Sequence, residues 1–413
     1  MKHRLFILAR ARWLRWLLVV AIVALYAGWI GYVVSQDKPL DFYVYYIAAY
    51  GFATGQDIYG AIGARASLWN HLAATLHITN YTYPYRYPPL AALLVWPLTF
   101  LSPPLASLIW LVATGVSFIL AAWLLGQTSN SKWGVALALT ILLFFVPPLT
   151  TMNAGQVNGL LLLALAIAIY GFARRSSMWT GTGVAIGALL KLVPFVHLAY
   201  LGWRRQWHTM LSGLIVAALL FCLAIPLIGW QGVRSYASNF LSLGEAGGLF
   251  PSGSSQSMTS FFARLLSPSN PTGHLTGNPQ LALQFGTGAS LVLVLATIAL
   301  CWPIGNLPSL FALEFALVTV AVNLITPFVW YHQLATLLLP FFVLAEHAVK
   351  SPHLRWMLLP LTAGYVLTDL HGLIWHHLEP WPLLASTPFY TMLMLWGLLA
   401  RLIVREKVKR ITA

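Results

Sequence analysis

The sequence is poor in charge, because only 8% of its 413 residues are Asp, Glu, Lys or Arg, and nine of these are acidic. It has two cysteines, Cys222 and Cys301, each inside an apolar run, so no disulfide framework is expected. Hydrophobic residues make up 59% of the chain, well above their share in soluble domains. These proportions exclude an ordinary soluble enzyme and predict an integral membrane protein that crosses the bilayer many times.

The formal net charge of +14 does not indicate a nucleic-acid partner. The Lys and Arg residues lie between apolar segments, and they form no stripe interleaved with base-stacking aromatics. The sequence shows no fixed-period repeat, no low-complexity tail and no separate soluble region. We therefore treat residues 1–413 as a single transmembrane domain.

A helix needs about 20 mainly apolar residues to span a bilayer. The candidate spans are 13–34, 104–126, 133–150, 156–173, 207–229, 286–303, 308–325, 331–347, 354–373 and 388–404. The first follows a basic N-terminus and is too long for a signal peptide, so we expect it to stay uncleaved. Two further regions are ambiguous, since 88–101 is short and bracketed by prolines, and 178–203 is interrupted by Lys191 and Pro194.

The distribution of Lys and Arg decides between the possible topologies, because cytoplasmic loops are rich in these residues. Suppose that 88–101 dips into the membrane and returns, and that 178–203 forms two short helices meeting near Lys191. The chain then crosses about twelve times with both termini cytoplasmic. This topology places 17 of the 23 basic residues on the cytoplasmic side, including Arg174–Arg175 and Arg204–Arg205.

The same topology collects polar residues on the outer face. Most of the acids avoid the cytoplasmic loops, namely Asp37, Asp41, Asp57, Glu245, Asp369, Glu379 and Glu314, which lies near the middle of its span. Loop 35–87 is rich in Tyr, with short amphipathic helices expected at 41–53 and 64–77. Because aromatic residues favour the interface, we expect these helices to lie along the membrane surface. The second long outer loop, 230–285, carries a Gly/Ser tract at 247–257 and is expected to be mobile.

Several separated motifs occur in a set order. They are Asp41 after the first span, Gly55-Gln-Asp-Ile-Tyr59, Tyr85-Arg-Tyr-Pro-Pro89, Asn153-Ala-Gly-Gln-Val-Asn158, Lys191-Leu-Val-Pro194 and Thr326-Pro-Phe-Val-Trp-Tyr-His332. Each motif alone is weak, but the set, over about residues 36–345, resembles the polyprenyl-phosphate-sugar-dependent mannosyltransferases of glycosyltransferase family 87. The resemblance implies the all-α GT-C membrane fold. One departure is Gln333, which stands where the family often has a second histidine after His332, and it puts any role of a His pair in doubt.

Transfer of a sugar from a lipid phosphate needs a base for the acceptor hydroxyl and support for the departing phosphate. Asp41 suits the base, because it lies where an outer cavity would meet the lipid headgroups, and the resemblance favours it too. The alternative is that Asp41 caps the helix at 41–53. Asp57 is a second candidate for the site, and its alternative is a turn residue before Tyr59.

Lys191 is the candidate partner of the donor phosphate, because a charge inside an apolar stretch is costly and usually functional. The alternative is that its side chain extends to the outer interface. Arg86, between two tyrosines, could also pair with the donor phosphate. The alternative is that it is an exposed loop residue.

His332 could bond a phosphate or sugar, or pack at the end of a span. Gln156 and Asn158 suit sugar hydroxyls, with helix capping and interhelical hydrogen bonds as the alternative.

The resemblance implies a membrane glycosyltransferase, which we expect in the bacterial plasma membrane. The resemblance implies transfer of a hexose, mannose in the family, from a polyprenyl phosphate to a lipid or glycan acceptor outside the cytoplasm. A single displacement would invert the anomeric centre. No cofactor or metal is expected, since 153–158 contains no carboxylate where related oligosaccharyltransferases carry an acidic, metal-binding motif. The alternatives are a lipid-linked glycan polymerase or ligase and a lipid or sugar transporter, the latter disfavoured by the missing internal repeat.

Overall fold

The computed structural model describes residues 2–36, 41–60, 62–79, 81, 85–242, 249–267, 277–303 and 308–411. Asp37 and Glu245, two of the acids assigned to the outer face, lie outside these residues. Within them, the regular secondary structure is helical, apart from one isolated antiparallel bridge between Ser255 and Trp330. The predicted all-α class is confirmed.

The helices run through the described residues in the following order. They are α1 (Lys2–Ser35), α2 (Phe42–Ala53), α3 (Ile62–Thr75), α4 (Pro89–Val95), η1 (Trp96–Phe100), α5 (Pro103–Thr128), α6 (Gly134–Phe144), α7 (Val146–Ala154), α8 (Asn158–Ala173), α9 (Ser177–Leu190), α10 (Phe195–Trp203), α11 (Trp207–Ser242), α12 (Met258–Leu266), α13 (Pro279–Leu300), α14 (Pro308–Ile325), η2 (Tyr331–Leu337), α15 (Leu338–Lys350), η3 (Pro352–Met357), α16 (Leu358–Leu378), η4 (Leu384–Ser386) and α17 (Thr387–Ile411).

Seven helices of the described chain are long and apolar enough to cross a membrane. They cover Arg12–Ser35, Pro103–Thr128, Trp207–Ser238, Pro279–Leu300, Tyr331–Lys350, Pro352–Leu378 and Leu384–Arg410. The pair α6 and α7, bent by 58°, is an eighth candidate, and α8, α9 and part of α14 are shorter apolar helices. The chain is therefore an integral membrane protein. The topology of about twelve crossings stays a prediction.

The break predicted near Lys191 is present. α9 ends at Leu190, Lys191 is extended with φ −142° and ψ 134°, and α10 begins after Pro194. Proline cannot donate to a helical hydrogen bond, so the apolar stretch continues as a second short helix. The other ambiguous region, 88–101, forms the short helical pair α4 and η1.

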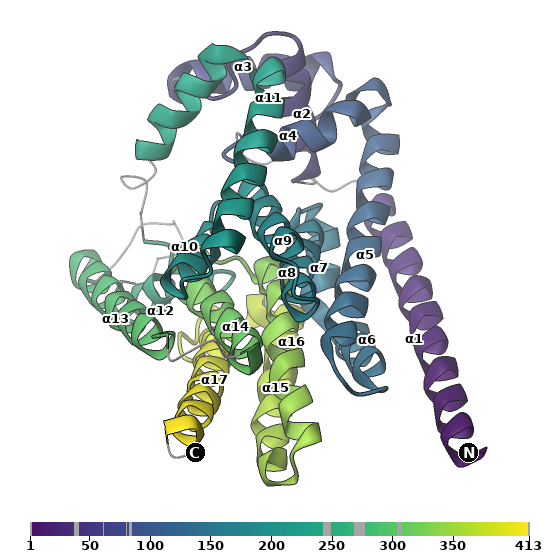
Figure 1. Ribbon diagram of the computed structural model, residues 1–413. Helices are drawn as coiled ribbons and strands as arrows, with labels where there is room; N and C mark the ends of the chain where they lie inside the picture. The colour runs from purple at the N-terminus through teal and green to yellow at the C-terminus, as the bar shows by residue number, and fades with distance from the viewer. Residues whose placement is uncertain are drawn as a thin grey trace.

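The arrangement places the connecting helices at one end of the molecule. α2, α3, α4 and the last part of α11 lie across this end, while both chain termini lie at the other (Figure 1). Between the ends, α1, α5 and α6 form one side, and α12, α13 and α17 form the opposite side, with α8 and α9 between them. A chain that crosses the membrane an even number of times must have both termini on the same side, and this arrangement meets that requirement.

Some tyrosines in and after α2 pack inside the protein, while the expectation that the helices of this loop lie along the membrane surface stays a prediction. Tyr45, Tyr46 and Tyr85 are fully buried, since α2 packs against α4, α5 and α11. A buried phenol needs a partner for its hydroxyl. Tyr46 donates to the carbonyl of Leu101 at 2.8 Å, and Tyr85 donates to the carbonyl of Pro88 at 2.6 Å.

The Gly/Ser tract was expected to be mobile, but its described part, 249–257, is held by hydrogen bonds to the rest of the protein. The backbone nitrogen of Gln256 donates to the carbonyl of Val329 at 2.8 Å, and that of Tyr331 donates to Ser254 at 3.0 Å. The buried guanidinium of Arg264 donates to the Ser252 carbonyl at 2.9 Å. The segment therefore braces the start of η2, which carries His332.

A buried ion cluster joins α10, α14 and α17. Oε2 of Glu314 lies 3.2 Å from Nε of Arg204, and Oε1 lies 3.6 Å from Nζ of Lys407. The Tyr200 hydroxyl also donates to Oε2, at 3.0 Å. The sequence grouped Glu314 with the acids that avoid the cytoplasmic side. Its partners Arg204 and Lys407 are both assigned to the cytoplasmic side, so the two assignments conflict, and the side on which Glu314 lies stays a prediction.

Candidate active site

The site is built around the sharp junction between α7 and α8. Gly155 ends α7 in the left-handed region with φ 67°, where glycine has no steric cost. Its carbonyl accepts a hydrogen bond from Nε1 of Trp110 at 2.9 Å. The junction is so short that Gln156 and Asn158, both buried, come at the very start of α8.

Gln156 binds the carboxylate of Asp41. Its amide nitrogen donates to Oδ2 of Asp41 at 2.5 Å, and its amide oxygen accepts from the Tyr45 hydroxyl at 2.9 Å. The backbone nitrogen of Asp41 donates to the carbonyl of Ala154 at 2.7 Å. Asp41 occupies the position before α2, but its side chain makes no capping hydrogen bond. The carboxylate is therefore directed toward the α7–α8 junction and not toward its own helix.

Tyr45, which is buried, and Tyr87, which is partly buried, fix the orientation of this amide. Burial raises the pKa of Tyr45 and of Tyr87, and the carboxylate of Asp41 raises both further. Both phenols stay protonated at neutral pH. Tyr45 donates its proton to the oxygen of Gln156, and the hydroxyl of Tyr87 lies within 3.2 Å of both amide atoms. With its oxygen occupied by a donor, the amide must turn its nitrogen toward Asp41.

A second network surrounds Lys191. Its Nζ donates to Oδ1 of Asn158 at 2.8 Å, and Nδ2 of Asn158 donates to the carbonyl of His332 at 3.1 Å. The same carbonyl accepts from the hydroxyl of Thr151 at 2.8 Å. Nε2 of His332 is buried, and no described residue hydrogen-bonds to it. The network holds the backbone of His332 and leaves that imidazole nitrogen available to a ligand.

Tyr87 joins the two networks. Its hydroxyl contacts Gln156, while its ring centroid lies 6.0 Å from Nζ of Lys191, within the range of a cation–π contact. Tyr87 thus links the carboxylate of Asp41, through Gln156, with the ammonium of Lys191. A cavity of about 30 Å³ beside Lys191, lined by apolar side chains and by polar ones such as Asn158 and Gln333, has room for ordered water.

Of the predicted site residues, the structure brings together Asp41, Gln156, Asn158, Lys191 and His332. The other two predicted residues, Asp57 and Arg86, take no part in these hydrogen bonds.

Asp57 holds a turn. It accepts from the backbone of Tyr59 at 3.2 Å and from the Ser235 hydroxyl at 2.6 Å. Arg86 is exposed. The sequence interpretation missed Tyr45, Tyr87 and Thr151. Only Tyr87 had a visible signal, because it belongs to the quoted Tyr85–Pro89 motif.

Asp369 and His371 of α16 form hydrogen bonds with other parts of the chain. Oδ1 of Asp369 accepts from the backbone of Val146 at 2.9 Å, and His371 contacts the carbonyl of Gly253 at 3.0 Å. In the described part of the chain, no three His, Cys, Asp or Glu side chains gather in a way that would hold a metal ion.

Comparison of the sequence with known protein families identifies the family of this chain. The family model of glycosyltransferase family 87 matches residues 85–327, more than half of the chain. The chain belongs to this family, and it is a glycosyltransferase of the membrane.

Two of the relatives have names that state a lipid-linked donor, polyprenol-phosphate mannose. The chain is 26% identical to a polyprenol-phosphate-mannose-dependent alpha-(1-2)-phosphatidylinositol pentamannoside mannosyltransferase of Mycobacterium tuberculosis, over 73% of this chain and 69% of the relative. It is 27% identical to a protein of the same name from Mycolicibacterium smegmatis, over 78% and 77% of the two chains. An alpha-(1->3)-arabinofuranosyltransferase of Corynebacterium glutamicum is 29% identical over 39% of each chain.

Proposed function

We propose that this chain transfers a mannosyl group from a polyprenyl-phosphate donor to a hydroxyl of a lipid or glycan acceptor outside the cytoplasm. The observation that carries the proposal is that Tyr87 links Asp41, through Gln156, with Lys191. Asp41 offers a carboxylate to the acceptor hydroxyl, and Lys191 offers a cation to the donor phosphate. The named donors of the mycobacterial relatives support the choice of donor.

Asp41 acts as the base in this proposal. As the acceptor hydroxyl oxygen attacks the anomeric carbon, its proton passes to the carboxylate, and the bond from that carbon to the phosphate oxygen breaks. The phosphate leaves with the electron pair. Because the attack comes from the side opposite the leaving group, the anomeric centre inverts. Gln156 holds one carboxylate oxygen through its amide nitrogen, which restricts rotation of the base.

Lys191 and His332 support the departing phosphate. The ammonium of Lys191 has three N–H donors, one of which goes to Asn158, so others can reach a phosphate oxygen. A charge-assisted contact of this kind stabilises the negative charge that develops on the leaving group. The buried Nε2 of His332, which no described residue hydrogen-bonds, is a second group for the phosphate or the sugar.

An apolar groove suits the lipid chain of such a donor. The groove has a volume of about 350 Å³ and lies between α10, α13 and α14, where Val196, Ile298 and Val318 line it. Val322 lines both this groove and the polar cavity beside Lys191. A polyprenyl chain in the groove would therefore have its phosphate end near the cation.

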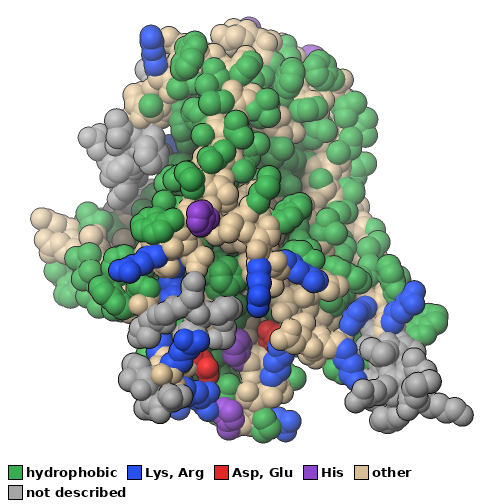
Figure 2. All heavy atoms as spheres, viewed as in Figure 1, with side chains coloured by type: hydrophobic (Ala, Val, Ile, Leu, Met, Phe, Trp, Pro, Cys, Tyr) green, Lys and Arg blue, Asp and Glu red, His purple; other side chains and the backbone are tan. Residues whose placement is uncertain are grey.

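The charge distribution supports an extracytoplasmic site. On the face drawn in Figure 2, most of the Lys and Arg side chains lie in the half that carries the termini. Basic residues favour the cytoplasmic side of a membrane protein. α2 begins directly after Asp41 and lies at the other end of the molecule (Figure 1).

The test is a reconstitution of the purified chain with synthetic polyprenyl-phosphate mannose and a bacterial membrane lipid extract. We expect a mannosylated lipid, identified by mass spectrometry, with the anomeric configuration opposite to that of the donor. A polyprenyl-diphosphate-linked glycan serves as the competing donor. Its consumption in place of the monophosphate would overturn the proposal in favour of a polymerase or ligase.

A further inference from the structure

Two helical turns on one face share the same backbone geometry. Arg174–Arg175 follows α8, and Arg204–Arg205 follows α10. In the first turn the nitrogens of Arg175 and Ser176 donate to the carbonyls of Phe172 and Gly171, and in the second those of Arg205 and Gln206 donate to Gly202 and Leu201, all at 2.9 Å. The second arginine of each pair has a positive φ, 57° at Arg175 and 56° at Arg205.

An arginine is an unfavourable residue for this backbone position. Helices that end in the left-handed region commonly place glycine there, because a side chain with a Cβ carries a steric cost. Arg175 occupies this left-handed position in the first turn, and Arg205 occupies it in the second. The hydrogen bonds that cap the two helices use only backbone atoms. A strained residue that the backbone does not need points to a role for its side chain.

The two arginines of each pair have different surroundings. The first is held by the protein, since the Arg174 guanidinium lies 5.0 Å from the Tyr170 ring centroid and buried Arg204 pairs with Glu314. The second is presented outward, because Arg175 and Arg205 are both exposed, and neither guanidinium hydrogen-bonds to a described residue. The difference in exposure occurs in the second turn alone, because Arg174 is exposed as well and contacts the ring of Tyr170.

The turns lie together. The hydroxyl of Ser212, early in α11, donates to the carbonyl of Ser177 at the start of α9, at 2.9 Å. At Gly181, an added Cβ would lie 2.2 Å from Oγ of Ser212, so α9 and α11 touch closely beside the turns. The two exposed arginines therefore belong to one face of the bundle.

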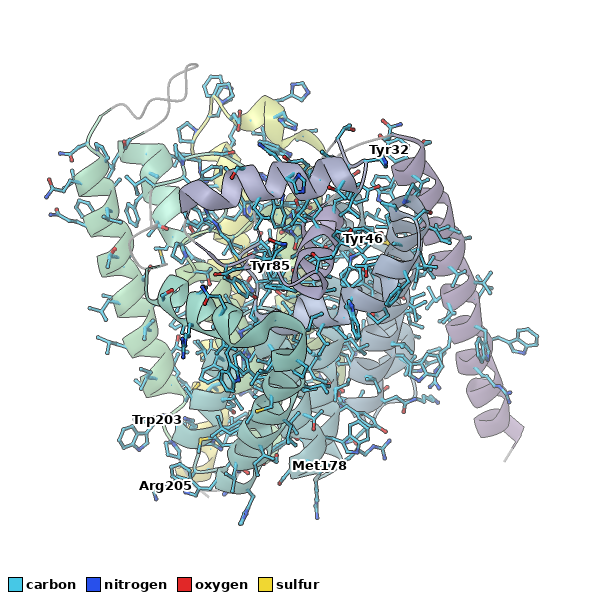
Figure 3. All side chains as sticks on the ribbon, turned by 90° about the horizontal axis from the view of Figure 1, so that it is seen from above. Tyr32, Tyr46, Tyr85, Met178, Trp203 and Arg205 are labelled. Atoms are coloured by element: carbon cyan, nitrogen blue, oxygen red, sulfur yellow. The ribbon has the colours of Figure 1, made fainter. Side chains whose placement is uncertain are left out.

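Exposed aromatic residues flank these arginines. Trp179, Trp203 and Trp207 are all exposed beside them. Figure 3 shows Met178, Trp203 and Arg205 projecting from one edge of the molecule, opposite Tyr32. Tryptophan at the ends of apolar helices favours the depth of the lipid headgroups. The guanidinium groups are thereby placed at the level of lipid phosphates.

We propose that Arg175 and Arg205 form a binding surface for the phosphate groups of anionic phospholipids. The planar guanidinium binds phosphate through two parallel N–H donors, and anionic headgroups attract basic clusters at a membrane surface. The flanking tryptophans favour a lipid over a soluble acidic protein as the partner. This inference needs only that the chain is embedded in a membrane, so it stands apart from the proposed transfer reaction.

The test compares Arg175→Gly/Arg205→Gly with the parent chain in nanodiscs of phosphatidylcholine, with and without phosphatidylglycerol. Phosphatidylglycerol should raise the unfolding temperature of the parent, and the double variant should lose most of this increase. In pure phosphatidylcholine the variant should unfold no lower than the parent, because glycine relieves the left-handed strain. Native mass spectrometry should find fewer phosphatidylglycerol molecules on the variant.

Two controls accompany this variant. Arg175→Lys/Arg205→Lys keeps the charge and should recover part of the lipid effect. Arg234→Gln removes an exposed charge from the last part of α11, at the other end of the molecule, and should leave the lipid effect intact. An unchanged lipid effect in the glycine variant would overturn the proposal. So would an equal loss of stability in both lipids, because the turns would then have a structural role alone.

Discussion

The amide nitrogen of Gln156 lies 2.5 Å from Oδ2 of Asp41, although 115 positions separate the two residues in the chain. The contact connects the start of α2 with the α7–α8 junction and restricts the rotation of the carboxylate. A base whose position is fixed by a second residue is ready to accept a proton along one direction. The following predictions test this and the neighbouring groups.

Replacing Asp41 by Asn should abolish transfer while the protein stays folded. Asn keeps an oxygen that can accept from Gln156, so the local hydrogen bond can persist, but an amide cannot take the acceptor proton. We expect the rate of mannosyl transfer to fall roughly 100-fold or more, with donor binding retained. Single-turnover transfer and equilibrium donor binding measure the two effects separately.

Asp57→Asn is the matched control. Asp57 holds the turn before Tyr59 and a hydroxyl of α11, and Asn can form equivalent hydrogen bonds. Most of the activity should remain. An inactive Asp57 variant beside an active Asp41 variant would show that the other carboxylate is the base.

Lys191→Met should weaken use of the donor. The change removes the ammonium and leaves the buried Oδ1 of Asn158 without its partner. Losing a hydrogen bond to a charged group costs about 1.5–3 kcal/mol, so kcat/KM for the donor should fall roughly ten- to a hundredfold. The exposed Lys132→Met serves as the control for loss of a single charge. Unchanged donor kinetics in the Lys191 variant would remove this residue from the site.

Tyr87→Phe should lower the rate without disturbing the fold. The phenyl ring can still lie against Lys191, but Gln156 loses one hydroxyl partner. A neutral hydrogen bond contributes about 0.5–1.5 kcal/mol, which corresponds to a rate reduced on the order of 2- to 10-fold.

Tyr85→Phe is the comparison for Tyr87→Phe. The Tyr85 hydroxyl bridges Pro88 and Ala92, so its loss should lower the unfolding temperature more than kcat. The reverse pattern would show that Tyr87 supports the fold and not the site.

The topology can be checked with single cysteines in a Cys222→Ala background, since Cys222 is exposed and Cys301 is buried. Cysteines at Ser176 and Gln206, in the two arginine turns, should react with an impermeant reagent only from the cytoplasmic side. A cysteine at the exposed position Arg86 should react only from outside. Labelling at Ser176 from the outside would refute the prediction that α9 and α10 form a hairpin whose two ends both lie on the cytoplasmic side.

Local sequence was enough for the class of the protein and for part of the site. Long apolar runs require helices in a membrane, because a lipid environment leaves backbone groups no other partner. The charge of Lys191 and the ring of Pro194 in an apolar stretch predicted the break between α9 and α10. Gln156 and Asn158 were found because they belong to the Asn153–Asn158 motif, which opens an apolar run and takes part in the family resemblance.

The tertiary structure alone separated residues that look alike in sequence. Asp41 and Asp57 both adjoin Tyr-rich segments, yet one meets Gln156 and the other meets Ser235. Tyr87, just before α4, gains its position only when α4 packs against α9, since its partners Gln156 and Lys191 are distant in the chain. Such contacts depend on how the helices pack, and helix packing depends on the shapes of whole side-chain surfaces, which no local pattern encodes.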